Sequence, residues 1–130
     1  MKEAVSDEHQ KLVKALMDKF TRDGLGILEA AYEGYSEPQK EGRHEPDIRA
    51  YDMATELLVI GEAKICDDLS SGRSKEQFQD FANRIMSTGK CENQAIPFHA
   101  ITPKKCEDEL IAVFEELGIL NKPNVHRWTI

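Results

Sequence analysis

The sequence contains no run of about 20 apolar residues, the length that a membrane-spanning helix needs. Its N-terminus, MKEAVSDEHQ, is polar and lacks the apolar core of a signal peptide. The three cysteines lie far apart and form no CxxC pair, which argues against a disulfide framework and against a structural zinc site. These absences predict a single cytoplasmic domain over residues 1–130, with reduced thiols and no membrane partner.

Positive charge is also scarce. The chain has 17 Lys and Arg residues against 24 Asp and Glu residues, which gives a net charge of −7. Proteins that bind nucleic acid usually carry a basic surface. Either the basic residues of this chain gather on one face, or its partner is not a nucleic acid.

Hydrophobic periodicity and turn residues predict the order helix, three strands, helix, strand, helix, strand. Three consecutive strands are typical of an antiparallel meander, and the later alternation is typical of helical crossovers. We therefore expect an α/β fold with a mixed sheet flanked by helices. The expected helices are 7–20, 75–90 and 106–117, and the expected strands are 25–35, 47–52, 57–65, 95–101 and 124–130.

Two details of this prediction concern helices. In the second helix, the apolar positions Phe78, Phe81, Ile85 and Met86 are expected to lie in the core. At the start of the third helix, the pair formed by Thr102 and Pro103 is typical of a helix cap followed by a first-turn proline.

The candidate catalytic and metal-binding residues lie in the stretch 46–65, PDIRAYDMATELLVIGEAKI. Side chains alternate along a strand, so Glu62 and Lys64 share one face at the end of the apolar run. If the two strands of this stretch form a hairpin, Asp47 lies near Glu62. Two carboxylates suit Mg²⁺ or Mn²⁺, and a lysine beside them can orient or deprotonate a water for phosphodiester hydrolysis. The simpler explanation of EAK alone is an exposed ion pair at a strand end.

The order of PD at 46–47, a strand, EAK at 62–64 and a helix resembles the signature of the PD-(D/E)XK nuclease superfamily. The core of that superfamily is helix, three strands, helix, strand, as expected here from residue 7 to residue 101. The stretches GRHEPDIRAYD, LLVIGEAKI and RSKEQFQDF look most like those of archaeal Holliday-junction resolvases. The resemblance implies a restriction-endonuclease-like fold and Mg²⁺- or Mn²⁺-dependent cutting of DNA. It also allows a homodimer, since a small nuclease that cuts two strands needs two sites.

The resemblance implies that Asp47 and Glu62 bind the metal and that Lys64 assists the water. Gln77 matches a glutamine that relatives carry on the helix after the EAK. Its spacing from Ser74 also fits a helix capping box, and both explanations stay open.

Relatives often direct a glutamate from the first helix toward the metal. Glu8 fits that place, but it is equally explained as a first-turn acid that interacts favourably with the helix dipole. Glu29, on the first strand, is the alternative residue. Three of the four histidines, His9, His99 and His126, show no ligand spacing and are expected to be structural or surface residues.

Several basic residues flank Asp47 and the second helix and could contact phosphates. Solvated surface is the default explanation for each of them. The candidates are Arg43, His44, Arg49, Arg73 and Lys75.

Three functions are compatible with the sequence. The first is a metal-dependent nuclease, and Asp47, Glu62 and Lys64 are all present for it. The second is a regulatory or nucleic-acid-binding module that keeps the fold without cutting. The third is an acidic protein-binding domain, which predicts no metal affinity at Asp47 and Glu62. The complete set of three residues favours the nuclease.

Overall fold

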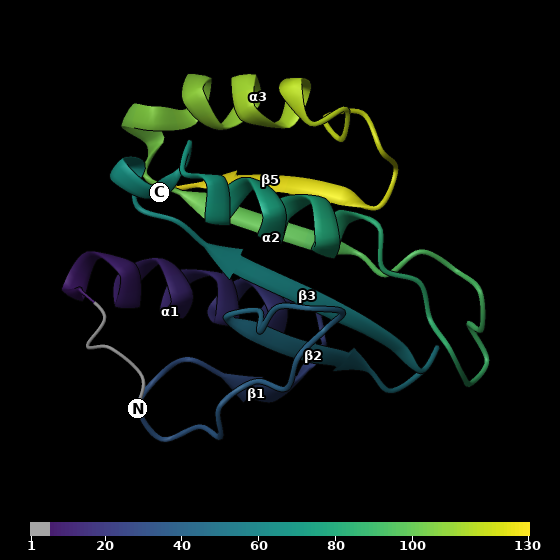
Figure 1. Cartoon of the computed structure of the whole chain (residues 1–130). Helices are drawn as coiled ribbons and strands as arrows, with labels where there is room; N and C mark the ends of the chain where they lie inside the picture. The colour runs from purple at the N-terminus through teal and green to yellow at the C-terminus, as the bar shows by residue number, and fades with distance from the viewer. Residues whose placement is uncertain (1–5) are drawn as a thin grey trace.

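The computed structural model describes residues 6–130 and has an α/β fold (Figure 1). A five-stranded mixed sheet and three α-helices make up this fold, which confirms the expected class. No helix within the described range is long and apolar enough to cross a membrane. The elements are α1 (Asp7–Arg22), β1 (Gly26–Ala30), β2 (Ile48–Asp52), β3 (Leu57–Ala63), η1 (Cys66–Asp68), α2 (Gly72–Ala82), β4 (Phe98–Thr102), η2 (Lys104–Cys106), α3 (Glu107–Glu116) and β5 (Val125–Thr129).

Each strand of the sheet lies beside the next strand in the chain, in the order β1-β2-β3-β4-β5. β1, β2 and β3 form an antiparallel meander, whereas β3, β4 and β5 run parallel. The parallel pairs are connected through α2 and α3, as crossover connections require. The carboxyl ends of β3, β4 and β5 therefore meet at one edge of the sheet.

The helices cover the sheet on both faces (Figure 1). α1 packs on one face, because its apolar residues recur at helical spacing and form a single buried stripe. α2 and α3 pack on the other face around a cluster of phenylalanines. The stripe consists of Leu12, Val13, Leu16, Met17 and Phe20, and the phenylalanine cluster consists of Phe78, Phe81, Phe98 and Phe114.

The β2–β3 hairpin determines which residues meet at the edge of the sheet. Its turn, residues 53–56, is held by Asp52, whose Oδ1 accepts a hydrogen bond from the Ala54 amide at 2.9 Å. The resulting register pairs Ile48 with Gly61. Asp47, just before β2, therefore lies beside Glu62 at the end of β3.

The structure corrects the predicted bounds of α2. This helix begins at Gly72 and ends at Ala82, eight residues before the expected end. Ile85 is not a core residue, because it is 54% exposed and forms an isolated bridge with Ala95. Met86 only packs, partly buried, against the core. Backbone hydrogen bonds between Met86 and the segment 93–94 replace the helical ones after the helix ends.

Two other predicted elements differ. β1 ends at Ala30 rather than at residue 35. Thr102 does not cap a helix; it is the last residue of β4, and its hydroxyl donates a hydrogen bond to the Lys64 carbonyl oxygen at 2.9 Å. The turn η2 lies between Thr102 and α3, so Pro103 begins that turn instead of the helix.

A disulfide joins Cys66 and Cys106, so the expectation of three reduced thiols is wrong. Their Cα atoms lie 5.7 Å apart although 40 residues separate them in the sequence. Cys66 follows β3 and Cys106 follows β4. Because these neighbouring strands are parallel, the segments that follow them meet at the same edge of the sheet.

We predict that the disulfide stabilises the fold by about 2–4 kcal/mol, since it constrains the unfolded chain. Cys66→Ser should lower the free energy of unfolding by that amount in urea titrations. The matched control is Cys91→Ser, because Cys91 is a buried free cysteine whose thiol donates to the Thr55 carbonyl. A dithiol reductant should destabilise the wild type and Cys91→Ser but not Cys66→Ser. Equal sensitivity of all three would contradict the prediction.

We also predict that Gly61 is required for the close approach of α1 to β3. A Cβ at this position would lie 2.9 Å from Leu16 Cδ2 and 3.1 Å from Phe20 Cε2. Gly61→Ala should therefore cost about 1–3 kcal/mol of stability by overpacking. Gly72→Ala is the control, because a Cβ there would meet no atom within 4 Å and alanine favours a helix. Thermal unfolding of both variants is the measurement, and a Gly61→Ala protein as stable as Gly72→Ala would disprove the constraint.

Candidate active site

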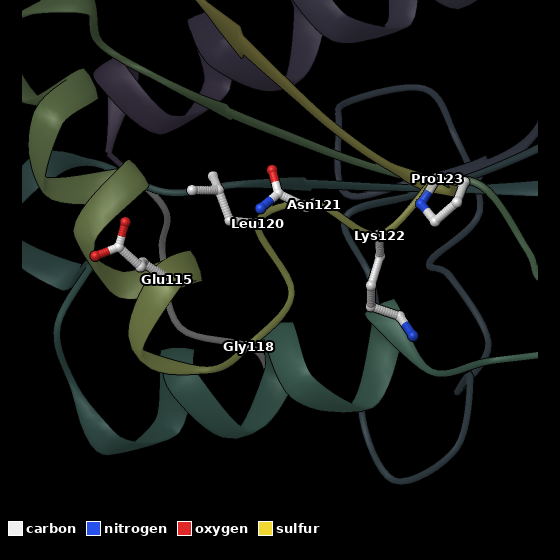
Figure 2. Close-up of a pocket in the computed structure, with 6 residues that line it drawn as sticks. All are labelled: Glu115, Gly118, Leu120, Asn121, Lys122 and Pro123. Carbon is white, nitrogen blue, oxygen red and sulfur yellow. The ribbon is translucent and has the colours of Figure 1, made fainter.

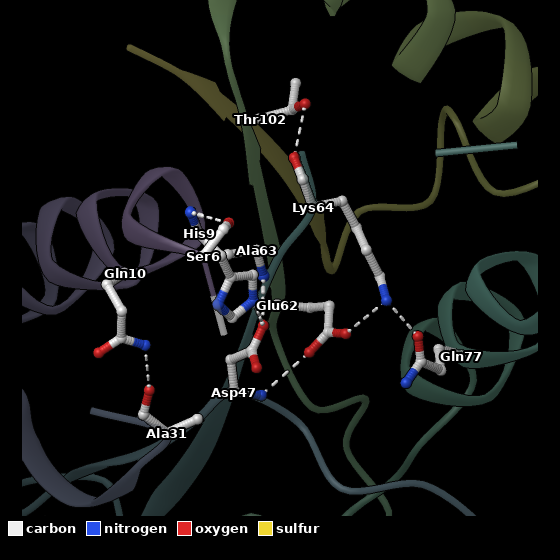
Figure 3. A network of polar contacts seen from close by, with 10 residues as sticks. All are labelled: Ser6, His9, Gln10, Ala31, Asp47, Glu62, Ala63, Lys64, Gln77 and Thr102. Carbon is white, nitrogen blue, oxygen red and sulfur yellow. Dashed lines mark hydrogen bonds and ion pairs between the residues drawn. The ribbon is translucent and has the colours of Figure 1, made fainter. Parts of the chain in front are cut away.

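Two carboxylates lie side by side where the β2–β3 hairpin opens (Figure 3). The Asp47 amide donates a hydrogen bond to Glu62 Oε1 at 3.0 Å. The Ala63 amide donates to Asp47 Oδ2 at 2.9 Å. Each carboxylate thus accepts a hydrogen bond from a backbone N–H group on the opposite side of the hairpin. Glu62 is only 3% exposed and the Asp47 side chain 14% exposed, so this pair is largely shielded from bulk water.

Lys64 and Gln77 extend this pair toward α2. Lys64 Nζ lies 3.1 Å from Glu62 Oε2 and also donates to Gln77 Oε1. The backbone of Lys64 is fixed as well, because its amide donates to the Ile101 carbonyl and its carbonyl accepts from Thr102. The sequence therefore predicted the neighbours of Lys64, but gave no sign of the part played by Thr102.

The capping-box explanation of Gln77 does not hold. The cap of α2 is Ser71, whose Oγ accepts from the Ser74 amide at 3.1 Å. Gln77 lies in the second turn, buried, with its side-chain oxygen on Lys64. Gln77 therefore contacts the predicted site through Lys64 and has no part in the helix cap.

On α1, His9 and not Glu8 faces the carboxylates. His9 Nε2 lies 3.1 Å from Asp47 Oδ2, whereas Glu8 is exposed and has no hydrogen bond or ion pair to either carboxylate. Sequence reasoning missed this histidine. A signal was present, because position 9 precedes Leu12 and Val13 by three and four residues and so continues the buried stripe of α1.

Glu29, the alternative to Glu8, belongs to a different cluster. Its Oε1 accepts from Arg49 Nη1 at 2.6 Å and from the Gln39 amide at 3.1 Å. Arg49 also donates to Glu41 Oε1 at 2.9 Å. Arg49 is therefore held between two acids and holds the segment before β2, which leaves it little freedom to contact a phosphate.

The other basic candidates differ in their availability. His44 Nδ1 lies 3.0 Å from Asp80, and Lys75 Nζ lies 3.0 Å from Glu116. Arg43 and Arg73 are exposed, and neither has an ion pair within residues 6–130. Only these two of the five predicted phosphate contacts have free charged groups in the described part of the chain.

The two carboxylates have opposite pKa shifts. Burial, followed by the negative charge of Asp47, raises the pKa of Glu62 well above its ordinary value, and Lys64 only partly offsets this. Burial also acts to raise the pKa of Asp47, but the hydrogen bond and charge of His9 and the Ala63 amide lower it overall. Asp47 is therefore the ionised member of the pair, and Glu62 is the member that more readily holds a proton.

The pKa of His9 responds to the same contact. Burial lowers this pKa, but the hydrogen bond and charge of Asp47 outweigh burial, so it lies above the ordinary value for a histidine. The pair formed by His9 and Asp47 is thus mutually stabilising.

The donor set suits a hard divalent cation that keeps part of its water shell. Within residues 6–130, no three His, Cys, Asp or Glu side chains are grouped as a complete metal cage. Mg²⁺ does not need such a cage, since it is commonly held by one or two carboxylates, with water and substrate oxygens as the other ligands. Asp47 and Glu62 can supply the two carboxylates. A cation bound by both would offset their mutual repulsion.

A surface hollow elsewhere in the fold lacks these features. It has a volume of about 430 Å³ and lies where α3 leads into β5 (Figure 2). Its two charged residues, Glu115 and Lys122, point in different directions. It lies at the start of β5, whereas the carboxylates lie at the end of β3, and these are opposite edges of the sheet because the strands are parallel. Its lining residues are Glu115, Gly118, Leu120, Asn121, Lys122 and Pro123.

Comparison with known proteins adds no further assignment: no protein-family model, no curated protein and no solved structure matches this chain. What is inferred about its chemistry therefore depends on its own residues and on the resemblance of its motif.

We predict that Glu62→Gln makes the metal-free protein more stable at neutral pH. A carboxyl with a raised pKa in the folded state stabilises the fold at low pH and ceases to do so as the pH rises through that pKa. The melting temperature of the wild type should fall over this range. That of Glu62→Gln should fall less and lie higher by roughly 4 °C at neutral pH.

The control for this measurement is Glu109→Gln, since Glu109 is exposed on α3. It should leave the pH profile of the melting temperature unchanged. A Glu62→Gln protein that melts below the wild type at neutral pH would show that the carboxylate stabilises the fold, against the prediction.

Proposed function

We propose that this protein is a metal-dependent deoxyribonuclease of the PD-(D/E)XK type, with a restriction-endonuclease-like arrangement of its sheet and helices. The observation that carries the proposal is the convergence of Asp47, Glu62 and Lys64 at one end of the β2–β3 hairpin. An isolated strand end would leave these groups in water. Here Glu62 is buried and the Asp47 side chain is only 14% exposed, and burial together with the charge of Asp47 raises the pKa of Glu62, a combination that is common at functional sites.

The residues have distinct roles in this proposal. Asp47 and Glu62 hold Mg²⁺ or Mn²⁺, and the bound ion polarises the phosphate and lowers the pKa of a water. Lys64 presents its ammonium beside Glu62, where it can orient the attacking water or stabilise charge on the phosphate. Gln77 fixes Lys64 by accepting one of its hydrogens. Arg43 and Arg73 contact the phosphates of the DNA backbone.

α2 contributes to phosphate binding through its orientation. Its N-terminal half lies next to Lys64, and its first turn carries no acidic residue that would offset the helix dipole. A helix N-terminus favours a nearby anion. This orientation supports a phosphate as the group that approaches Lys64.

The charge distribution supports an alternative, a non-catalytic module whose partner is a protein. The net charge is −7, and Arg49, His44 and Lys75 are engaged in internal ion pairs. The alternative retains the fold without turnover. It predicts neither metal affinity nor DNA cleavage, which makes the two functions separable in one assay. A homodimer stays a prediction under either function.

We predict Mg²⁺- or Mn²⁺-dependent cleavage of labelled DNA that is abolished by EDTA. Linear duplex, single-stranded and four-way-junction substrates should be compared, because the site does not define the DNA structure. Asp47→Ala and Lys64→Ala should each reduce the rate by about 100-fold or more, since one removes a metal ligand and the other the ammonium beside the reacting phosphate.

The matched controls are Asp18→Ala and Lys14→Ala, which remove an exposed ion pair on α1. Both should cut at the wild-type rate. If no substrate is cut by the wild type with either metal, or if Asp47→Ala cuts as well as Asp18→Ala, the nuclease proposal is wrong.

A further inference from the structure

The contact between His9 and Asp47 indicates a role that the nuclease motif does not include. We propose that His9 is a positioning residue, whose imidazole holds Oδ2 of Asp47 and so leaves Oδ1 to face the metal ion. This inference rests on the proposed metal site and deepens it, because it states which oxygen of Asp47 is offered and what keeps it there.

The direction of the hydrogen bond follows from the chemistry of the pair. A carboxylate that binds a metal ion is ionised, so both of its oxygens can only accept hydrogen bonds. His9 Nε2 must therefore carry the hydrogen and donate it to Oδ2, 3.1 Å away. Oδ2 thus accepts two hydrogen bonds, from His9 and from the Ala63 amide. Oδ1 accepts none from residues 6–130.

The position of His9 is set by its neighbours in the first turn of α1. Its own amide donates to the capping Ser6 Oγ at 3.1 Å. Gln10 Nε2 donates to the Ala31 carbonyl at 2.9 Å (Figure 3). The Ala31 amide in turn donates to the Asp47 carbonyl at 2.7 Å. The first turn of α1 is therefore linked to the backbone of Asp47 through Ala31, independently of the imidazole.

The imidazole has one polar contact in the described part of the chain. Its other nitrogen, Nδ1, is buried without a hydrogen-bond partner. A histidine that only fastened α1 to the sheet would be expected to satisfy both nitrogens, since a buried unpaired polar atom is costly. The single contact that this ring makes is with the carboxylate that the metal needs.

A carboxylate that is free to rotate presents either oxygen and loses that freedom when a metal binds. Two hydrogen bonds on Oδ2 remove most of this freedom beforehand, so less entropy is lost on binding. Groups that orient metal ligands in this way typically contribute 10- to 100-fold to metal affinity, and we expect a loss of about that size without the imidazole.

The test is the affinity for Mn²⁺, measured by titration calorimetry on wild type, His9→Ala, His9→Asn and His9→Gln. The side-chain nitrogen of glutamine reaches the place of Nε2, whereas that of asparagine reaches only as far as Nδ1. His9→Gln should bind Mn²⁺ within about 3-fold of the wild type, and His9→Ala and His9→Asn about 10- to 100-fold more weakly. Lys14→Ala, on the same helix, should match the wild type.

Melting temperatures of the metal-free variants show whether each is folded, and a variant that is not folded is replaced by His9→Leu. Three results would overturn the inference. The variants could bind Mn²⁺ as tightly as the wild type, which would leave His9 a purely structural role. His9→Gln could be as weak as His9→Ala, which would make the ring nitrogen itself a ligand. The wild type could fail to bind Mn²⁺ at all.

The proposed function fails in a different way. If Mn²⁺ binds with the expected dependence on residue 9 but no DNA substrate is cut, the positioning role stands and the nuclease is wrong. Cleavage and metal affinity thus report on the two proposals separately.

Discussion

The pairing of two carboxylates, with Glu62 buried and Asp47 largely buried, is the interaction on which the rest of the site depends. Glu62 lies in β3 and Asp47 just before β2, and the register of the two strands places them side by side. Placing like charges together away from water is unfavourable, and a fold tolerates it only where hydrogen bonds and opposite charges compensate. Each surrounding element supplies one such group: the Ala63 amide from β3, His9 from α1, and Lys64 held by α2.

The sequence predicted the contacts that depend on local structure, but not those between elements that lie far apart in the sequence. The hairpin and the approach of Asp47 to Glu62 follow from strand alternation and a short turn, which are local properties. His9 was missed because its contact exists only once α1 has packed on the sheet. The stripe of apolar residues predicts that packing, but it does not show that His9 at its end, expected to be a structural or surface residue, contacts Asp47. The disulfide was missed for a similar reason, since only the parallel pairing of β3 and β4 brings Cys66 to Cys106.

The end of α2 shows that hydrophobic periodicity alone does not determine where a helix ends. Apolar residues continue at helical spacing to Met86, so periodicity alone extends the helix. The chain instead leaves the helix after Ala82, and backbone pairing with residues 93–94 satisfies the amides that the helix would have used. Tertiary pairing therefore outweighed local propensity, as it commonly does at helix ends.

The internal ion pairs affect how the net negative charge of the chain is interpreted. Arg49, His44 and Lys75 stand near the motif in sequence, but the ion pairs of Arg49 and Lys75 and the contact of His44 with Asp80 hold the segment before β2 and the helix α2 in place. The distance of a basic residue from Asp47 along the sequence does not show whether its side chain forms an internal ion pair or is available to a phosphate. The cations that remain are few, so in the proposed nuclease the attraction for DNA would come largely from the metal site. A divalent ion between Asp47 and Glu62 would reverse the local charge at the point where a phosphate has to approach.

The backbone around the carboxylates explains why their repulsion persists in the folded protein. β3 is fixed on one face by the contact of Gly61 with α1 and, at its end, by the hydrogen bonds of Lys64 to Ile101 and Thr102. The disulfide at Cys66 fastens the chain just beyond. These contacts hold Glu62 beside Asp47, and Lys64 and His9 offset part of the repulsion between the two carboxylates. In the proposed metal site, a bound cation would offset the remaining repulsion.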